Sequence, residues 1–401
     1  MADRIVRFGV VGGGLMGREF ASAAARWVHL ADIGVRPEIT VVCDVNPEVL
    51  AWYERLEPRP RLVSDYATLL ADESVEAVYC AVPHHLHEEL YIAVLQARKH
   101  LLGEKPFGID LPANEAIMAE VAAHPELLVR CSSEFPFYPG GQEVFRFIRE
   151  RRSGRVLEVR SQFLHSSDLD PEKPINWKRR AELNGEYGCM GDLGVHALHL
   201  PLRAGWLPEN VRAILSNVFT ERRDDAGGWA ACDTWDNAVL LCEARADDAA
   251  FPLRIETKRI APGETNTWVV EIDGTEGSIA FSTKLPKTLR FMEYRPGGKQ
   301  AWQTLDLGSQ SAYPTITGAI FEFGFPDGIL QMWAAFLDEL AHGREGMRQP
   351  FHCATPEEVA WTHRLFTAAL RSHAECAVVR VVPPTTGHEA QRAEAEADLR
   401  P

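Results

Sequence analysis

The feature that most constrains the fold is a glycine-rich stretch close to the start of the chain. Gly12-x-Gly14-x-x-Gly17 follows an apolar run, Ile5–Val11, and opens a helical pattern, Leu15–His29. In such a context the first glycine allows a tight turn, the second lets the backbone approach a pyrophosphate, and the third lets helix and strand pack closely. The N-terminus of the helix adds amide donors and a positive partial charge. The pattern predicts a dinucleotide-binding Rossmann domain; a glycine-rich turn in a Rossmann relative that binds no nucleotide is the alternative.

A second apolar run, Ile39–Cys43, ends on the acid Asp44. A carboxylate at this place accepts hydrogen bonds from the ribose hydroxyls of the adenosine half and would repel a 2′-phosphate. Asp44 lies further from the glycines than the usual ~20 residues, which a long first helix and an insert at residues 34–37 would explain. Since no arginine follows Asp44 immediately, the sequence predicts NAD in preference to NADP. A solvated acid at a strand end is the alternative.

The alternation of strand and helix patterns continues over the first third of the chain. Near-continuous apolar runs separated by helices indicate a parallel sheet that is covered on both faces. Further strands are expected at Val75–Val82, His100–Leu102 and Leu127–Cys131, and further helices at His85–Ala97 and Pro112–Ala123. These elements predict an N-terminal Rossmann domain with a doubly wound parallel sheet over residues 1–132.

From about Val156 the pattern changes to runs that alternate apolar and polar residues, with few helices between them. Such runs are typical of an antiparallel sheet with one solvated face. Asp-Gly separates two of the runs, but residues 274–277 are too long an interval for a two-residue hairpin, so a loop is expected. Helical patterns return at Ile329–Ala341 and at Pro356–His373, the second with Thr355 as its N-cap. The predicted fold class is therefore α/β, with a C-terminal α+β domain over residues 133–382 and a mobile tail over residues 383–401.

Composition limits the partners of the chain. Its 401 residues suggest two domains, and its formal net charge of -15 disfavours nucleic acid and anionic membrane as partners. No apolar run approaches the roughly 20 residues of a membrane-spanning helix, and residues 1–7 leave no room for the apolar part of a signal peptide. The eight cysteines are scattered without a CxxC pair, which favours buried, reduced thiols. We therefore expect a cytoplasmic protein.

The segment after the His100–Leu102 run carries a family resemblance. Glu104-Lys105-Pro106 resembles the EKP motif of the glucose–fructose oxidoreductase and inositol dehydrogenase (Gfo/Idh/MocA) family. Three further segments are similar to that family, in the expected order: AVPHHLHEEL at 81–90, GDLGVHALH at 191–199 and the late helix at 355–375. The resemblance extends from about residue 5 to residue 382.

This resemblance implies a fold, an assembly and an activity. The fold is a Rossmann domain followed by a C-terminal domain on a largely antiparallel open sheet, with the helix at 355–375 packed back on the nucleotide domain. The family assembles as homodimers or homotetramers through the open sheet face. Its members mostly move a hydride between NAD(P) and a ring hydroxyl or carbonyl of a sugar, a cyclitol or a related polyol.

The resemblance also implies the catalytic residues. Lys105 should lie between nicotinamide and substrate and polarise the reacting oxygen, with a cis bond before Pro106. Asp192 and His196 stand four residues apart and share one face if the segment opens a helix. His196 is the expected general base, since an imidazole with a pKa near 6.5 suits a hydroxyl proton. Asp192 would orient the substrate or stabilise the imidazolium; Lys105 and His196 could exchange roles, because family members differ on this point.

Further residues are assigned to the cofactor and to the substrate. The expected cofactor-binding residues are Gly12, Gly14, Leu15, Met16, Gly17, Asp44, Pro83, His84, His87, Glu104 and Lys105. The expected substrate-binding residues are Trp177, Lys178, His165 and Tyr187, although a buried anchor is an equal interpretation of Trp177. His199 extends the spacing of Asp192 and His196 toward a metal-ligand pattern, but no paired Cys or Glu is nearby and hydride transfer needs no metal, so none is expected.

The chain departs from the family pattern in two places. His84 stands where the family often has asparagine. Ser-Glu-Phe-Pro, which contains Glu134 and Pro136, stands where Asn-x-Arg-Phe is frequent. These departures argue against any one well-studied substrate.

Three functions remain compatible with these residues. The first is an NAD-dependent dehydrogenase or reductase of a sugar, cyclitol or polyol. The second is an NAD-dependent glycoside hydrolase that works by transient oxidation and elimination. The third is a non-enzymatic NAD-responsive regulator, against which the joint presence of Lys105, Asp192 and His196 argues.

Overall fold

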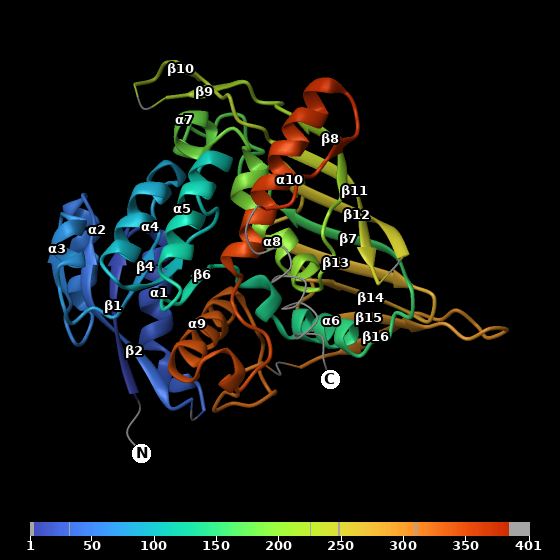
Figure 1. The fold of residues 1–401 in the computed structure, drawn as a ribbon, viewed down its shortest axis with the longest axis horizontal. Helices are drawn as coiled ribbons and strands as arrows, with labels where there is room; N and C mark the ends of the chain where they lie inside the picture. The colour runs from blue at the N-terminus through green and yellow to red at the C-terminus, as the bar shows by residue number, and fades with distance from the viewer. Residues whose placement is uncertain (1–3, 32, 225, 248, 309–310, 385–401) are drawn as a thin grey trace.

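Two β-sheets with helices packed between them and around the first sheet make up the fold (Figure 1). The computed structural model describes residues 4–31, 33–224, 226–247, 249–308 and 311–384. The tail expected to be mobile, residues 383–401, lies outside the described residues except for its first two.

The first sheet has six parallel strands in the order β3-β2-β1-β4-β5-β6. Its strands are β1 (Arg4–Val11), β2 (Val35–Cys43), β3 (Arg61–Val63), β4 (Ala77–Cys80), β5 (His100–Gly103) and β6 (Val129–Cys131). This order is that of a Rossmann fold and confirms the predicted parallel sheet. The strand order reverses between β1 and β4, and ligands of such sheets bind at the carboxyl ends of the strands at that point.

Two details of this sheet differ from the sequence prediction. β2 begins at Val35, which pairs with Arg4, so the segment expected to be an insert is part of the strand. β3 was not predicted, because its three residues are too few for an alternating pattern to be visible.

Ten α-helices lie within the described residues. They are α1 (Leu15–Ala25), α2 (Pro47–Ala51), α3 (Tyr66–Leu70), α4 (His87–Gln96), α5 (Leu111–Ala123), α6 (Pro139–Arg149), α7 (Ala181–Asn184), α8 (Cys189–Arg203), α9 (Phe325–His342) and α10 (Pro356–Glu375). The helix expected to reach His29 ends earlier, and a 3-10 turn, Trp27–His29, continues it.

The second sheet has nine strands in the order β16-β15-β14-β13-β7-β12-β11-β8-β17. They are β7 (Val156–Leu164), β8 (Asn210–Ser216), β11 (Asn237–Ala246), β12 (Ala249–Lys258), β13 (Thr267–Gly274), β14 (Gly277–Ser282), β15 (Thr288–Glu293), β16 (Gln303–Asp306) and β17 (Val379–Arg380), while β9 (Glu221–Arg223) and β10 (Trp229–Ala231) form a separate pair. Every neighbouring pair is antiparallel except β7 and β12. The predicted, largely antiparallel sheet is confirmed. The segment expected to be a loop closes a hairpin whose last paired residues are Asp273 and Ser278.

Burial alternates along the strands of this sheet, as in β13, where Val270 and Ile272 are buried and Glu271 is partly exposed. Helices α6, α8 and α10 pack on the buried face, between the two sheets (Figure 1). The other face carries charged side chains such as Arg160, which pairs with Glu271.

Helices α9 and α10 join the two halves of the chain. On α9, Trp333 stacks on Phe20 of α1 with ring centroids 3.7 Å apart. Helix α10 packs on α8 and β8 and also contacts α5 and β6 of the parallel sheet. One hydrophobic core therefore includes residues of both sheets.

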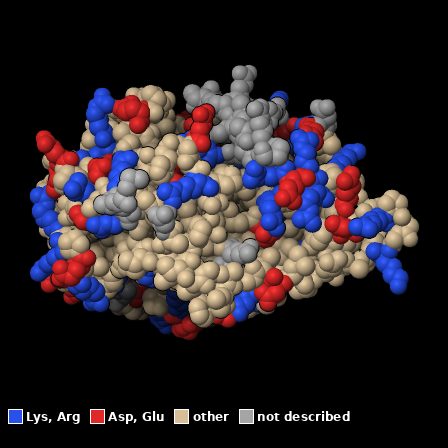
Figure 2. Space-filling model, turned by 90° about the horizontal axis from the view of Figure 1, so that it is seen from below, with Lys and Arg blue, Asp and Glu red and all other residues tan. Residues whose placement is uncertain are grey.

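The surface and the thiols bear on the expectations from composition. No helix within the described ranges is long and apolar enough to cross a membrane. Basic and acidic side chains are interspersed on the face shown in Figure 2. All eight cysteines are free thiols; seven are buried, as expected, and Cys376 is exposed.

Candidate active site

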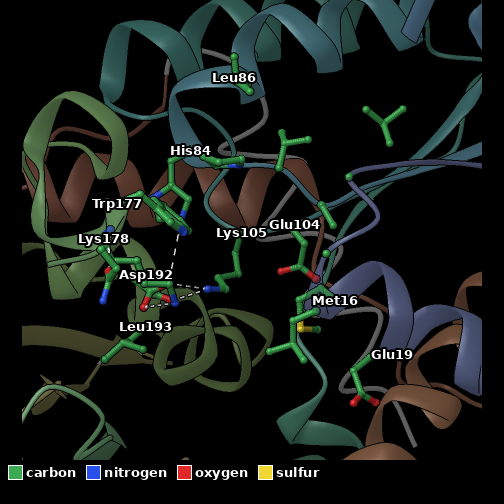
Figure 3. Close-up of a pocket in the computed structure, with 18 of the residues that line it drawn as sticks. Met16, Glu19, His84, Leu86, Glu104, Lys105, Trp177, Lys178, Asp192 and Leu193 are labelled. Carbon is green, nitrogen blue, oxygen red and sulfur yellow. Dashed lines mark hydrogen bonds and ion pairs between the residues drawn. The ribbon is translucent and has the colours of Figure 1, made fainter. Parts of the chain in front are cut away.

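A cavity of about 1020 Å³ opens at the carboxyl ends of β1, β2 and β4 and extends to α8 and the end of β12 (Figure 3). Its walls include the turn between β1 and α1, the Glu104–Lys105 segment, the loop before Lys178, and Asp192 and His196 of α8. The topology therefore brings the glycine motif and the expected catalytic residues to one space.

The turn between β1 and α1 has the geometry that the glycine motif predicts. Gly12 has a φ of +91°, and a Cβ there would lie 2.2 Å from the carbonyl oxygen of Ala81. A Cβ on Gly14 would meet nothing within 4 Å, so the backbone is open to the cavity at this residue. Gly17 does not line the cavity; a Cβ there would lie 2.4 Å from the oxygen of Gly12, which makes it the close-packing glycine. Helix α1 has no side-chain cap, so its first amides are free to donate to an anion.

Asp44 follows β2 at the same end of the cavity. Its Oδ2 accepts a hydrogen bond from the Gly13 amide at 2.8 Å, and its Oδ1 accepts one from the Asn46 amide at 2.9 Å. Tyr66 and Glu89 also line this end, and the Tyr66 hydroxyl donates to Glu89 at 2.6 Å. The charged side chains that line this end of the cavity are thus acidic.

Lys105 lies at the opposite end of the cavity, and its peptide bond to Pro106 is cis, as expected. Its Nζ donates to the backbone oxygen of Asp192 at 2.7 Å and to Oδ1 of the same residue at 2.9 Å. Burial lowers the pKa of Lys105, while the charge of Glu104 raises it. Glu104 lines the cavity beside it and accepts a hydrogen bond from the Tyr79 hydroxyl at 2.7 Å.

His196 lies one turn after Asp192 on α8, so both side chains face the cavity. The rings of Phe135 and Phe163 each pack against its imidazole with centroids 4.9 Å apart. Burial, followed by the charge of Lys105, holds the pKa of His196 well below its ordinary value. Its Nδ1 has no hydrogen-bond partner among the described residues. A neutral imidazole with an unpaired nitrogen is able to accept a proton.

Asp192 is the centre of an ionic network that the sequence did not reveal. Arg259, directly after β12, donates to Asp192 and lies 3.5 Å from Asp168. Lys178 Nζ lies 3.1 Å from Asp192 Oδ1, and Lys173 Nζ donates to Asp168 at 2.7 Å. Sequence reasoning missed Asp168, Lys173 and Arg259, because no motif or spacing distinguishes them from ordinary strand and loop residues.

Most of the other residues expected to contact the cofactor or the substrate line the cavity. Leu15, Met16, Pro83, His84, His165, Trp177 and Lys178 all line the cavity. Trp177 packs edge-on against His84 with centroids 4.9 Å apart, and Nδ1 of His84 is 2.9 Å from the Asn184 oxygen.

Two of the expected contact residues do not line the cavity, and their side chains bond other parts of the chain. His87 is buried outside the cavity, where its two ring nitrogens face the backbone oxygens of Val82 and Pro106 and the neutral ring donates to one of them. The Tyr187 hydroxyl pairs with Thr367 of α10 at 2.7 Å, so this side chain connects the turn before α8 to α10. His199 also lies outside the cavity, with Arg203 Nη2 3.2 Å from its Nε2.

Two family models match the chain. The oxidoreductase family with an NAD-binding Rossmann fold matches residues 6–130, and the GFO/IDH/MocA C-terminal domain matches residues 142–280. The chain belongs to the Gfo/Idh/MocA oxidoreductase family. It is therefore an oxidoreductase with an NAD-binding Rossmann domain, as the glycine and EKP motifs predicted.

Relatives of this Gfo/Idh/MocA member include sugar and cyclitol dehydrogenases. Levoglucosan dehydrogenase of Pseudarthrobacter phenanthrenivorans is 28% identical over 287 residues, which are 68% of this chain and 73% of the relative. Inositol 2-dehydrogenase of Acidothermus cellulolyticus is 29% identical over 306 residues, 75% of this chain and 80% of the relative. A solved levoglucosan dehydrogenase in complex with NADH and levoglucosan is 24% identical, with a TM-score of 0.82, over 94% of this chain and 100% of that chain. The structural likeness shows a shared two-sheet fold.

The dinucleotide that the Gfo/Idh/MocA family implies fits the residues of this cavity. The open space at Gly14 allows the backbone to approach a pyrophosphate, and the uncapped amides of α1 supply donors to it. Asp44 faces the same end of the cavity with a carboxylate suited to ribose hydroxyls.

Proposed function

We propose that this enzyme moves a hydride between the nicotinamide of NAD and a ring hydroxyl or carbonyl carbon of a sugar, a cyclitol or a related polyol. The observation that carries the proposal is one cavity lined both by Gly14 and Asp44 and by Lys105, Asp192 and His196. The named substrates of the relatives, levoglucosan and inositol, support the polyhydroxylated substrate class.

Each catalytic side chain has a role that its surroundings support. Bound NAD supplies the hydride acceptor. His196 takes the hydroxyl proton, since burial keeps its imidazole neutral. Lys105 Nζ donates a hydrogen bond to the reacting oxygen, and Asp192 holds Lys105 in place through two hydrogen bonds. Trp177 offers a ring face to the apolar side of a sugar.

The preference for NAD over NADP rests on the acidic end of the cavity. Asp44 and Glu89 line it, and the four lining cations within the described ranges all belong to the network around Asp192 and Asp168. A 2′-phosphate at the adenosine end would therefore face negative charge without a compensating cation.

Assembly and location complete the proposal. Among the described residues no helix packs on the charged face of the nine-stranded sheet, and Ile214 and Leu241 are exposed there. We assign homodimer or homotetramer formation to this face, and the cytoplasm as the site of action. Light scattering of the purified enzyme measures the assembly.

The test of the function combines nucleotide binding and turnover. Calorimetric titration should give saturable NADH binding that is much tighter than NADPH binding. Lys105→Ala and His196→Ala should each lower kcat with NAD and a polyol by roughly 10²-fold or more, with little change in NADH affinity. Near-normal turnover in both variants would refute the assignment. Cleavage of nitrophenyl glycosides without net NADH formation would replace it with the elimination route.

A further inference from the structure

Three cations form the wall of the cavity that faces away from Asp44. Lys173 lies on the loop that precedes the 3-10 turn Trp177–Arg179, and Lys178 lies within this turn. Arg259 directly follows β12. All three line the cavity. We call these three residues the basic wall.

The basic wall has fewer carboxylates than cations. Arg259 is shared between Asp168 and Asp192, Lys173 pairs with Asp168, and Lys178 pairs with Asp192. Three cations therefore share two carboxylates.

The remaining charges at this end do not correct the imbalance. Lys105 also pairs with Asp192, and the charge of Glu104 acts on Lys105. Glu134, the other acid that lines this end, has a pKa raised to about 8, mainly by burial, so its uncharged form predominates at neutral pH. At this end of the cavity four cations face the three carboxylates of Asp168, Asp192 and Glu104. Burial and the charges of Arg259 and Lys105 lower the pKa of Lys178 well below its ordinary value, so an anion bound beside it favours its charged form.

The two lysines of the wall remain partly open to the cavity, whereas the carboxylates are covered. The side chains of Lys173 and Lys178 are 36% and 34% exposed, but those of Asp168 and Asp192 are 1% and 2% exposed. Figure 3 shows Lys178 and Lys105 on opposite sides of Asp192. A ligand that enters the cavity therefore meets ammonium groups.

Neighbouring groups show the effect of this charge and add neutral hydrogen-bonding side chains. His165 lines the same cavity, and its pKa is lowered to about 4 by burial and by the charges of Arg259 and Lys178. Ser167, Asn176 and Asn266 line it as well, and their hydroxyl and amide groups donate hydrogen bonds. The site thus combines positive potential with neutral donors, which is the chemistry that an anionic, hydroxylated ligand needs.

We propose that the substrate is an acidic sugar, an aldonate or a uronate, whose carboxylate binds at Lys173 and Lys178 while its ring or chain hydroxyl faces Lys105 and His196. The inference rests on the proposed function and names its substrate class. A carboxylate supplies the single charge that is missing. A phosphate, with about 1.5 to 2 negative charges at neutral pH, would exceed it. Arg259 holds Asp168 and Asp192 in place and is itself covered by them.

The test compares matched substrates. Initial rates of NADH formation are measured for neutral hexoses, for the corresponding aldonates and uronates, and for the hexose 6-phosphates. We expect kcat/KM for one of the acids to exceed that of its neutral partner at least tenfold, and we expect added salt to weaken this preference. Lys178→Gln should reduce the ratio of acid to neutral kcat/KM at least tenfold, and Lys178→Arg should restore most of it. NADH affinity, measured by calorimetry, should stay the same in both variants.

A matched control and the opposing outcomes separate the two proposals. Lys287→Gln removes an exposed lysine next to β15 that pairs with Glu322, and it should leave the ratio unchanged. If neutral sugars are turned over as well as their acids, or hexose phosphates better than both, the carboxylate assignment falls and the dehydrogenase proposal stands. If no substrate of the panel reduces NAD although NADH binds, the dehydrogenase proposal is refuted, and the inference about the substrate class is refuted with it.

Discussion

Glu134 is a carboxyl group whose surroundings favour its uncharged form. It is buried in the cavity wall at the place where the family often has a different motif. Burial and then the charge of Glu104 raise the pKa of Glu134 to about 8, although Lys105 opposes the shift. At neutral pH the group is therefore able to donate a hydrogen bond into the cavity.

This shift predicts a pH dependence of stability. Because the folded pKa of about 8 lies above the ordinary value of 4.5, the proton is held more tightly in the folded state. The bound proton of Glu134 contributes fully to stability at a pH below the ordinary pKa. This contribution is lost as the pH rises through the pKa of the folded state. Glu134→Gln keeps the shape and removes the titration, so its melting temperature relative to the parent enzyme should increase between pH 6 and pH 9, by roughly 1–3 °C. Thermal unfolding without nucleotide measures this, and parallel curves for the two proteins would contradict it.

For single residues, the sequence predicted which side chains lie in the cavity where these residues belong to a recognisable motif. The family resemblance singled out Lys105, Asp192 and His196, and all three line the cavity. Arg259 was not foreseen, because its partners come from distant segments and only the folded chain brings them together. His87 and Tyr187 lie outside the cavity for a related reason, since a polar side chain near a site can as easily bond the protein itself.

At the scale of elements, periodicity and capping were reliable for long segments. Helix α10 begins where predicted, because Thr355 and Glu358 cap each other's backbone amides. Strands of two or three residues, such as β3 and β17, are fixed by pairing with a neighbour and leave no pattern of their own. The long strand β2, in contrast, was visible in the sequence as an apolar run that ends at Asp44. The carboxylate of Asp44 also accepts a hydrogen bond from Gly13 and so holds the turn after β1.

Asp44 gives a prediction that belongs to this strand end. Asp44→Ala removes the acceptor for the ribose hydroxyls and the negative charge opposed to a 2′-phosphate. NADH affinity should fall about tenfold, the equivalent of roughly 1.4 kcal/mol, and NADPH affinity should fall less or rise. Asp44→Asn keeps an acceptor for the Gly13 amide and serves as the matched control for a disturbed turn. Calorimetry with both nucleotides measures the ratio, and an unchanged ratio in both variants would mean that another group reads the ribose.

For the whole molecule, the decisive feature is that the late helices return to the first sheet. Trp333 of α9 contacts Phe8 of β1 and Tyr79 of β4, in addition to its stacking on Phe20. Buried ion pairs add to this joint: Arg203 of α8 pairs with Glu358 of α10, and Arg130 of β6 pairs with Glu339 of α9. The family resemblance implied that α10 packs back on the nucleotide domain, and α10 does contact α5 and β6, whereas the sequence did not show the surface against which α9 packs. We propose that the Rossmann and C-terminal domains unfold as one cooperative unit.

Trp333→Ala tests this cooperativity. Removing a large buried ring from the joint should lower the free energy of unfolding by about 3–5 kcal/mol, and because both sheets share this core the whole transition should move to lower urea. Tryptophan fluorescence and far-UV circular dichroism should report the same shifted midpoint. Trp302→Ala, which removes an exposed ring near β16, should stay within about 0.5 kcal/mol of the parent protein. Two separated transitions, of which Trp333→Ala shifts only one, would show that the sheets unfold independently and that the shared core does not couple them.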